Sequence, residues 1–204
     1  MENISNAIVK QITENEYGKL YFISDFHFPG KEEAVKKNLF RLCEKGVLVR
    51  LAHGIYLYPA KHEKIGILYP SMDEIAMAIA ARDKSECLPT GILAMNTLGF
   101  STQVPMNAVY ITNGTPRSIQ VGHRKIVFKK AAPKYFHYKS KLMFMLTSAL
   151  KEMGKENIDS KVLDRIKELL AIKNEIALYR DDLALVPVWI KKILITVINQ
   201  IADE

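Results

Sequence analysis

The chain has 204 residues, and its 29 Lys and Arg against 22 Asp and Glu give a formal net charge of +7. This excess favours an anionic partner, while two cysteines and five scattered histidines without metal-ligand spacing predict neither a zinc site nor a disulfide framework. The amino-terminal MENISNAIVKQ lacks the apolar core of a signal peptide, and no uncharged apolar run approaches the roughly 20 residues of a membrane span. We therefore expect a cytoplasmic protein with no membrane association.

Four elements are expected before residue 46. Apolar residues at helical spacing predict a helix over 4–13, and a β-rich run predicts a strand over 20–23. Ser24 is placed to cap a very short helix. Residues 31–45 carry a second apolar stripe at helical spacing, and Gly46 is placed to end that helix.

The stretch RLCEKGVLVRLAHGIYLYP continues with two β-rich segments, VLVR and GIYLY, joined by a turn at LAHG. The order helix, strand, short helix, basic helix and hairpin is typical of a winged helix-turn-helix domain, which we predict for residues 1–62. In that architecture the third helix enters the major groove of DNA. The hairpin, or wing, lies along a neighbouring groove or backbone, which would explain Arg50 and His53 at its tip.

Residues 63–204 are predicted to form a mixed α/β domain with a small sheet and carboxy-terminal helices, so the predicted fold class is α+β. Ser71 and Glu74 form a capping box that predicts a helix to about residue 82. Further helices are predicted over 90–99, 140–153, 159–172 and 187–202, and strands over 107–112, 117–121 and 125–129. The pair Asp181-Asp182 is interpreted as the start of the last helix rather than as a metal-binding dyad.

The positive charge is concentrated in one segment. Residues 87–151 contain nine Lys and Arg and no Asp or Glu. A segment of this kind is expected to present a positive face to phosphates or to an acidic protein, although a chance bias on a partly buried segment is an alternative. The candidates for this basic patch, toward DNA or a protein, are Arg117, Arg124, Lys125, Lys129, Lys130 and Lys134.

No catalytic motif is present among those tested, which include a Walker A loop, GxGxxG, HExxH and GxSxG. The acid-free segment is a poor place for general acid–base catalysis, because such catalysis commonly uses carboxylates to carry the proton. We therefore expect no catalytic residues, no bound metal and no cofactor, and a protein that is not an enzyme.

Two blocks carry a family resemblance. LFRLCEKGVLVRLAHGIYLYP resembles the winged-helix segment of the AbiEi-type antitoxins of bacterial abortive-infection systems. TGILAMNTLGFSTQVPMNAVYITNGTPRSIQVGHRKIVFKKAAP resembles the core of their second domain, so that the resemblance covers roughly residues 15–135. It implies the antitoxin half of a type IV toxin–antitoxin pair. Such a protein represses its own operon by binding inverted repeats in double-stranded DNA, and its carboxy-terminal domain neutralises a nucleotidyltransferase-like toxin.

Pattern and resemblance together give the DNA-binding candidates. On the helix and wing these are Lys31, Lys36, Lys37, Asn38, Arg41, Lys45, Arg50 and His53. The lysines are expected on phosphates, whereas Asn38 suits adenine and Arg41 suits guanine. The family often has Arg or Lys where this chain has His53, and an unperturbed imidazole titrates near pH 6.5, so wing affinity is expected to be weaker or pH-sensitive.

Two other functions remain open at this stage. A solitary winged-helix regulator or a protein-interaction module without a toxin partner fits the same pattern. A nuclease would need a carboxylate cluster, which residues 87–151 do not supply. The sequence leaves the oligomeric state undecided.

Overall fold

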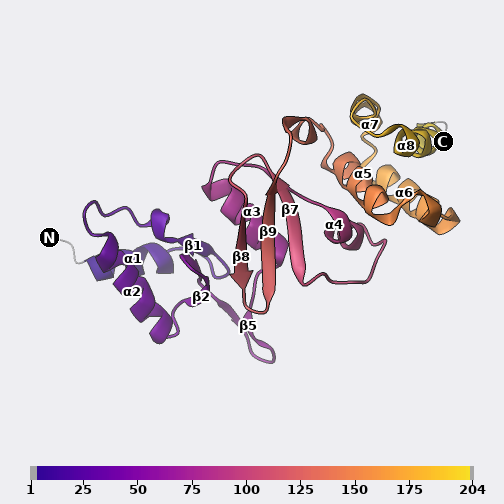
Figure 1. The fold of residues 1–204 in the computed structure, drawn as a ribbon. Helices are drawn as coiled ribbons and strands as arrows, with labels where there is room; N and C mark the ends of the chain where they lie inside the picture. Colours follow the sequence, from indigo (N-terminus) through magenta and orange to yellow (C-terminus); the bar gives the residue numbers. More distant parts are fainter. Residues whose placement is uncertain (1–3, 203–204) are drawn as a thin grey trace. The chain divides into compact units, whose positions relative to one another are not determined.

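The computed structural model describes residues 4–202, which form a mixed α/β fold with eight α-helices and three small sheets in that range (Figure 1). The chain divides into two compact units, Met1–Ile79 with Ile119–His123, and Ala80–Ser118 with Arg124–Glu204. These units group residues 63–79 with the amino-terminal elements, whereas the sequence predicted a boundary after residue 62. Within residues 4–202 no helix is both long and apolar enough to cross a membrane.

The first unit begins with six elements that follow the predicted order closely. They are α1 (Ile4–Thr13), β1 (Leu20–Phe22), the 3-10 helix η1 (Ile23–Asp25), α2 (Glu32–Glu44) and the hairpin β2 (Val49–Ala52) and β3 (Ile55–Leu57). The sheet has the order β1-β3-β2 with antiparallel neighbours. Leu57 faces Leu20 on one side and Val49 on the other, so the fully buried β3 holds the sheet together.

Helices α1 and α2 supply the apolar core of this unit. Val35, Leu39 and Leu42 of α2 are buried, which confirms the predicted stripe. They share one cluster with Ile8 and Ile12 of α1. Gly46 follows α2 with a φ of 67°, a left-handed conformation that glycine adopts without a side-chain clash.

Two further elements follow, a hairpin in the first unit and a helix whose last residues, 80–82, are grouped with the second unit. The hairpin of β4 (Ala60–His62) and β5 (Gly66–Leu68) was not predicted, because each strand has only three residues and lies largely in solvent. Helix α3 (Met72–Arg82) begins at the predicted capping box. There the Ser71 amide donates to Glu74 Oε2 at 2.6 Å, and the Glu74 amide donates to Ser71 Oγ at 3.1 Å.

The next sheet has four strands in the order β6-β7-β9-β8, and it belongs to the second unit except for residues 119–121 of β8. Its strands are β6 (Cys87–Pro89), β7 (Asn107–Thr112), β8 (Arg117–Val121) and β9 (Arg124–Lys130). The predicted strands are confirmed as β7, β8 and β9, but β6 was not predicted. Strand β7 pairs in parallel with β9, from Asn107 opposite Lys125 to Thr112 opposite Lys130, and antiparallel with β6.

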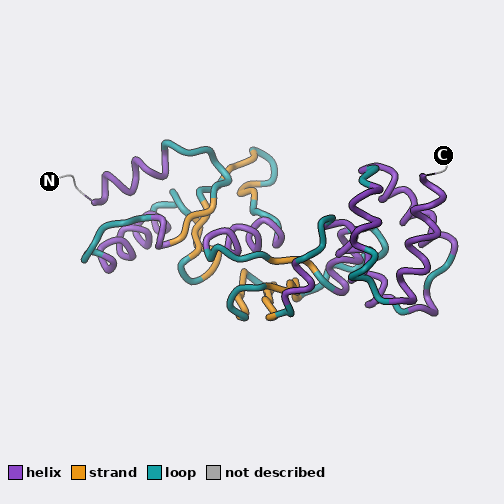
Figure 2. Tube along the Cα trace, turned by 90° about the horizontal axis from the view of Figure 1, so that it is seen from above, coloured by secondary structure: helices purple, strands orange, loops and turns teal. Residues whose placement is uncertain are grey.

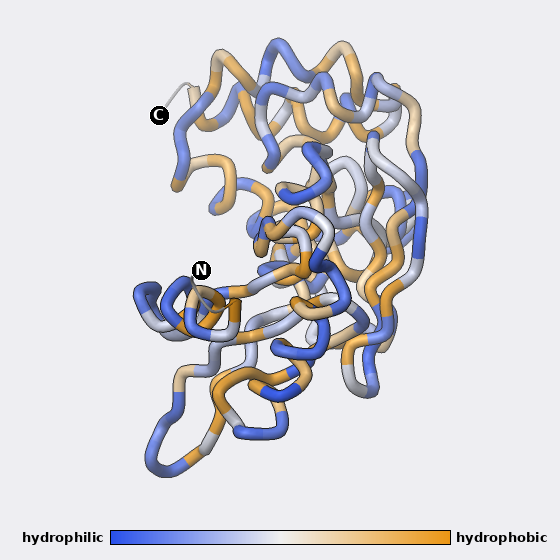
Figure 3. The backbone as a smooth tube through the Cα atoms, turned by 90° about the vertical axis from the view of Figure 1, so that its left-hand side faces the viewer, coloured by the Kyte–Doolittle hydropathy of each residue, from blue (hydrophilic) through white to orange (hydrophobic). Residues whose placement is uncertain are grey.

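After the sheet the chain is helical (Figure 2). The helices of this unit are α4 (Gly91–Thr97), α5 (Lys141–Met153), α6 (Ser160–Lys173), α7 (Ile176–Asp182) and α8 (Val188–Ala202). Hydrophobic and hydrophilic positions alternate along the carboxy-terminal helices (Figure 3). Helix α5 is the centre of the apolar core, since eight of its residues from Leu142 to Leu150 are buried.

The interpretation of Asp181-Asp182 as a helix start was wrong. The two residues end α7, which the sequence reading missed. Asp182 is only 1% exposed, and its two carboxylate oxygens accept the main-chain N–H groups of Lys139 and Ser140, each at 2.8 Å. Asp182 therefore fixes the two residues that lead into α5, a helix that begins about 40 residues earlier in the chain.

Candidate nucleic-acid interface

Helix α2 presents a cationic face opposite its buried stripe. Lys36, Lys37 and Arg41 are exposed, while Val35 and Leu39 point into the core. Residues four apart are neighbours on a helix surface, so Lys37 and Arg41 form one exposed pair of cations. Of the DNA-binding candidates on this helix, these two are the ones that the structure brings together on the open face.

Lys36 is engaged within the helix. Its Nζ lies 2.6 Å from Glu33 Oε1, and both side chains are exposed. This hydrogen bond lowers the pKa of the Glu33 carboxyl and raises the pKa of the Lys36 ammonium. Part of the positive charge of α2 is thus offset by an acid one turn away, and Lys37 and Arg41 carry the remainder.

Asn38 is half-buried and uses its amide donor inside the helix. Its Nδ2 donates to the Ala34 carbonyl at 2.9 Å. Reading adenine with both amide groups requires that donor, so Asn38 would have to release Ala34 first. Lys31 and Lys45 occupy the N-cap and C-cap positions of α2, both exposed. At about 1.5 Å per residue, the helix separates them by roughly 20 Å.

The hairpin tip joins the two residues that the sequence placed there. Arg50 Nη2 lies 3.2 Å from His53 Nδ1, and Arg50 Nε donates to the Ala52 carbonyl at 3.4 Å. A β-bulge between Arg50 and Ala52 and a φ of 71° at Gly54 shape the turn. Because the guanidinium can only donate, the contact needs an unprotonated Nδ1 on His53.

The sequence reading missed some exposed residues of this unit. Lys61 and Lys64 belong to the β4–β5 hairpin, where the Lys64 amide also donates to His62 Nδ1 at 3.2 Å. The signal that could have found them is the basic stretch AKHEK just before a short β-rich run. Phe40 of α2 is 57% exposed and adds an apolar surface beside the cations.

Three of the six residues of the basic patch hold the second unit together. Arg117 pairs with Asp83, and its guanidinium lies 5.7 Å from the centre of the Phe128 ring. Arg124 donates to the Pro105 carbonyl at 3.4 Å. Lys130 donates to the carbonyls of the turn at residues 113–114. These three cations are therefore engaged in contacts within the second unit.

Asp83 provides the acid that the segment 87–151 lacks. Burial opposes its ionisation, but hydrogen bonds from Arg82 and Arg117 outweigh burial and lower the pKa of the Asp83 carboxyl. The remaining members of the basic patch are Lys125, Lys129 and Lys134, all exposed. Lys134 Nζ lies 5.3 Å from the centre of the Tyr135 ring. These three lysines are the part of the patch available to a partner.

Residues 4–202, which the structure describes, contain no group of three or more His, Cys, Asp or Glu side chains that could hold a metal ion. Cys43 is half-buried and Cys87 is buried, and the two form no disulfide with each other. Burial raises the pKa of the Cys43 thiol, and the nearby charge of Arg50 opposes that rise.

Comparison with known proteins places these features in a family. A search of curated proteins gave no match. A family model described as a family of unknown function, DUF6088, matches residues 7–178. The match runs from α1 into α7 and so includes both the cationic face of α2 and the parallel β7–β9 pair. Because the family model matches most of the length of the chain, the chain belongs to the DUF6088 family.

Proposed function

We propose that the amino-terminal elements form a winged helix-turn-helix and that the protein is a DNA-binding transcriptional repressor. The observation that carries this proposal is the exposed Lys37 and Arg41 pair on α2 in the same unit as the Arg50–His53 pair of the hairpin tip. Helix α2 would enter the major groove, and the hairpin tip would meet the neighbouring backbone.

The order of elements supports this assignment. Helix α1, strand β1, helix α2 and the β2–β3 hairpin follow one another as in winged helices, and the sheet order β1-β3-β2 places the hairpin against β1. The three-residue η1 stands where a longer second helix is usual. The helix-turn-helix would therefore be an abbreviated one, with η1 as its first short helix.

The biological setting that we propose comes from the AbiEi-type resemblance. The protein would act as an antitoxin that represses its own operon at inverted repeats. Its second unit would neutralise a nucleotidyltransferase-like toxin. The exposed Lys125, Lys129 and Lys134 supply positive charge for an acidic surface on that toxin. Coexpression with the product of a neighbouring nucleotidyltransferase-like gene tests this half: rescue of growth supports it, and unrelieved toxicity argues against it.

A protein-interaction module is the second candidate. Phe40 at 57% exposure beside the ion-paired Lys36 favours it, because aromatic side chains anchor protein interfaces and paired lysines bind phosphate less readily. In that case α2 would contact a protein, and duplex DNA would bind weakly and without sequence preference.

Fluorescence anisotropy separates the two candidates. A labelled duplex from the region upstream of the gene is compared with a scrambled duplex over a salt series. Arg41→Ala is expected to cost about 1–3 kcal/mol on the native duplex and to relax sequence preference, whereas Lys37→Ala should weaken both duplexes and reduce the salt slope by about 1. Lys10→Ala, an exposed lysine of α1, is the matched control and should change neither quantity. Equal, weak binding of wild type to both duplexes would refute sequence-specific repression.

A further inference from the structure

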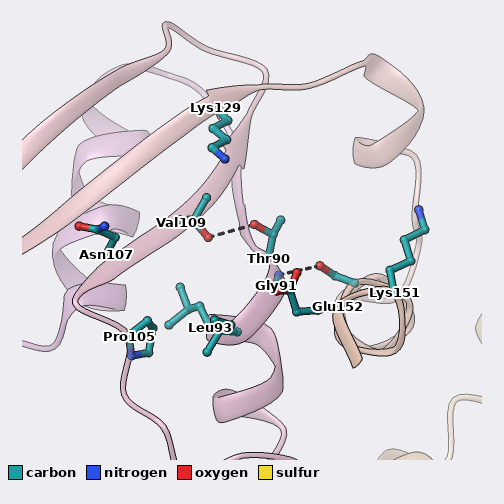
Figure 4. A pocket seen from close by; sticks show the side chains of 11 residues that line it. Thr90, Gly91, Leu93, Pro105, Asn107, Val109, Lys129, Lys151 and Glu152 are labelled. Atoms are coloured by element: carbon teal, nitrogen blue, oxygen red, sulfur yellow. Dashed lines mark hydrogen bonds between the residues drawn. The ribbon is translucent and has the colours of Figure 1, made fainter. Parts of the chain in front are cut away.

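The second unit contains a pocket of about 450 Å³ that the proposed DNA contacts do not use. Its walls come from α4, β7, β9 and α5, together with Pro105 in the loop before β7 (Figure 4). The volume falls within the range of pockets that bind small molecules, and it is several times that of a lone phosphate ion. The pocket therefore has room for a ligand with a ring as well as a charged group.

Hydrogen bonds fix the frame of this pocket. The Gly91 amide donates to Ser148 Oγ of α5 at 3.1 Å, and both the amide and the hydroxyl of Thr90 donate to the Val109 carbonyl, at 3.1 and 3.2 Å (Figure 4). These bonds tie the start of α4 to α5 on one side and to β7 on the other. Hydrogen bonds thus connect three of the four elements that line the pocket.

Its charged groups are two cations and one anion. Lys129 extends from β9 over Val109, and Lys151 stands on α5 with its Nζ 5.5 Å from the centre of the Tyr135 ring (Figure 4). Both lysines belong to the acid-free segment. Glu152, the first residue after that segment, is the carboxylate that lines the pocket. The charged side chains of the pocket therefore sum to a net positive charge, and the Glu152 carboxylate adds a hydrogen-bond acceptor to the two ammonium donors.

Gly91 makes room for the carboxylate. Its φ is 58°, and a Cβ built on it would lie 3.1 Å from Glu152 Oε2. A side chain at this position would strain the backbone and push Glu152 away. The glycine therefore permits the position of the one acidic group of the pocket, as Figure 4 shows where Glu152 reaches toward Gly91.

We propose that this pocket binds a purine nucleoside monophosphate. Lys129 and Lys151 would hold the phosphate, since ammonium groups pair with phosphate oxygens. Glu152 would accept hydrogen bonds from the N–H groups on the edge of the base. Leu93, Pro105 and Val109 offer apolar contacts for the flat faces of the ring. A phosphate ion alone would leave Glu152 facing a like charge, whereas a ligand that carries N–H donors satisfies both signs.

Isothermal titration of the full-length protein with GMP tests this assignment, with guanosine and inorganic phosphate as partial ligands. GMP is expected to bind with a Kd of about 10–500 µM, and each partial ligand at least about tenfold more weakly. Lys129→Ala and Lys151→Ala should each weaken GMP at least about fivefold. Lys173→Ala removes an exposed lysine at the end of α6, outside the pocket, and it should leave the Kd unchanged.

Glu152→Gln distinguishes a nucleotide site from a general anion site. The substitution keeps the shape and removes the negative charge, so it should weaken GMP while strengthening inorganic phosphate. Thermal unfolding followed by circular dichroism verifies that each variant is folded. Absence of GMP binding at about 5 mM overturns the proposal. So does unchanged affinity in both lysine variants, equal affinity for guanosine and GMP, or tighter GMP binding by Glu152→Gln. Calorimetry measures nucleotide binding and fluorescence anisotropy measures DNA binding. Failure of either proposal therefore leaves the other standing.

Discussion

Replacing Asp182 with Asn is the sharpest test of how the second unit is held together. The buried carboxylate accepts the main-chain N–H groups of Lys139 and Ser140, the two residues just before α5. An asparagine of the same size keeps one acceptor oxygen and turns an NH₂ group toward the other N–H. The change therefore removes one of the two hydrogen bonds and the negative charge without opening a cavity.

The expected loss follows from these contacts. A hydrogen bond to a charged group contributes about 1.5–3 kcal/mol, and a buried N–H left without an acceptor costs about 1–3 kcal/mol. The negative charge near the amino-terminal end of α5 adds a smaller stabilisation through the helix dipole. We expect Asp182→Asn to lower the free energy of unfolding by about 2–4 kcal/mol, a large part of the roughly 5–15 kcal/mol typical of a domain.

Urea unfolding measures this loss directly. Trp189, the single tryptophan of the chain, lies in α8 and packs against the same core, so its fluorescence reports on this unit. Asp181→Asn is the matched control, because Asp181 is exposed and forms an ion pair with Lys139 at 2.7 Å. An exposed pair of this kind contributes at most about 1 kcal/mol. A loss below about 1 kcal/mol for Asp182→Asn, or equal losses for both variants, would refute this role of the two Asp182 hydrogen bonds.

Two other stability predictions rest on single side chains. Asp159 is the N-cap of α6, and its Oδ1 accepts a hydrogen bond from the Val162 amide at 2.9 Å. Asp159→Ala should therefore lower the free energy of unfolding by about 1 kcal/mol in the same urea assay. An unchanged urea midpoint would contradict the capping role of Asp159. Asp83→Asn should reduce stability at neutral pH and flatten its acid dependence. The folded-state pKa of Asp83 is depressed, so its contribution is present above the unfolded-state value of about 3.9 and is lost as the pH falls through the folded value. Thermal unfolding of both proteins between pH 7 and pH 2 checks this, and a gap between wild type and variant that does not narrow in acid would count against it.

Local patterns in the sequence were sufficient for most of the elements. The isoleucine spacing of α1 gave its bounds, and the Ser71–Glu74 capping box gave the start of α3. The strands of β7 and β8 also appear over the predicted residues. Each of these signals lies within a few residues of the element that it specifies, which is why a single sequence reveals it.

Features that depend on distant residues could not be predicted in the same way. Asp182 pairs with amides more than 40 positions away, so its neighbours in the chain suggested a helix start instead. The parallel pairing of β7 with β9 is hidden by the two turn signals that separate the strands. Among the candidate site residues, the sequence could not show that Glu33 pairs with Lys36 or that Arg117 faces Asp83.

The position of β9 has a consequence for the order in which this protein matures on the ribosome. Strand β7 leaves the exit tunnel before β8, yet its parallel neighbour is β9, the last strand of the sheet to be made. Until Lys130 has emerged, the side of β7 that β9 will cover carries unpaired main-chain groups, a template for pairing with another nascent chain. Slow translation between residues 113 and 130 would lengthen that exposure, and rapid translation would shorten it.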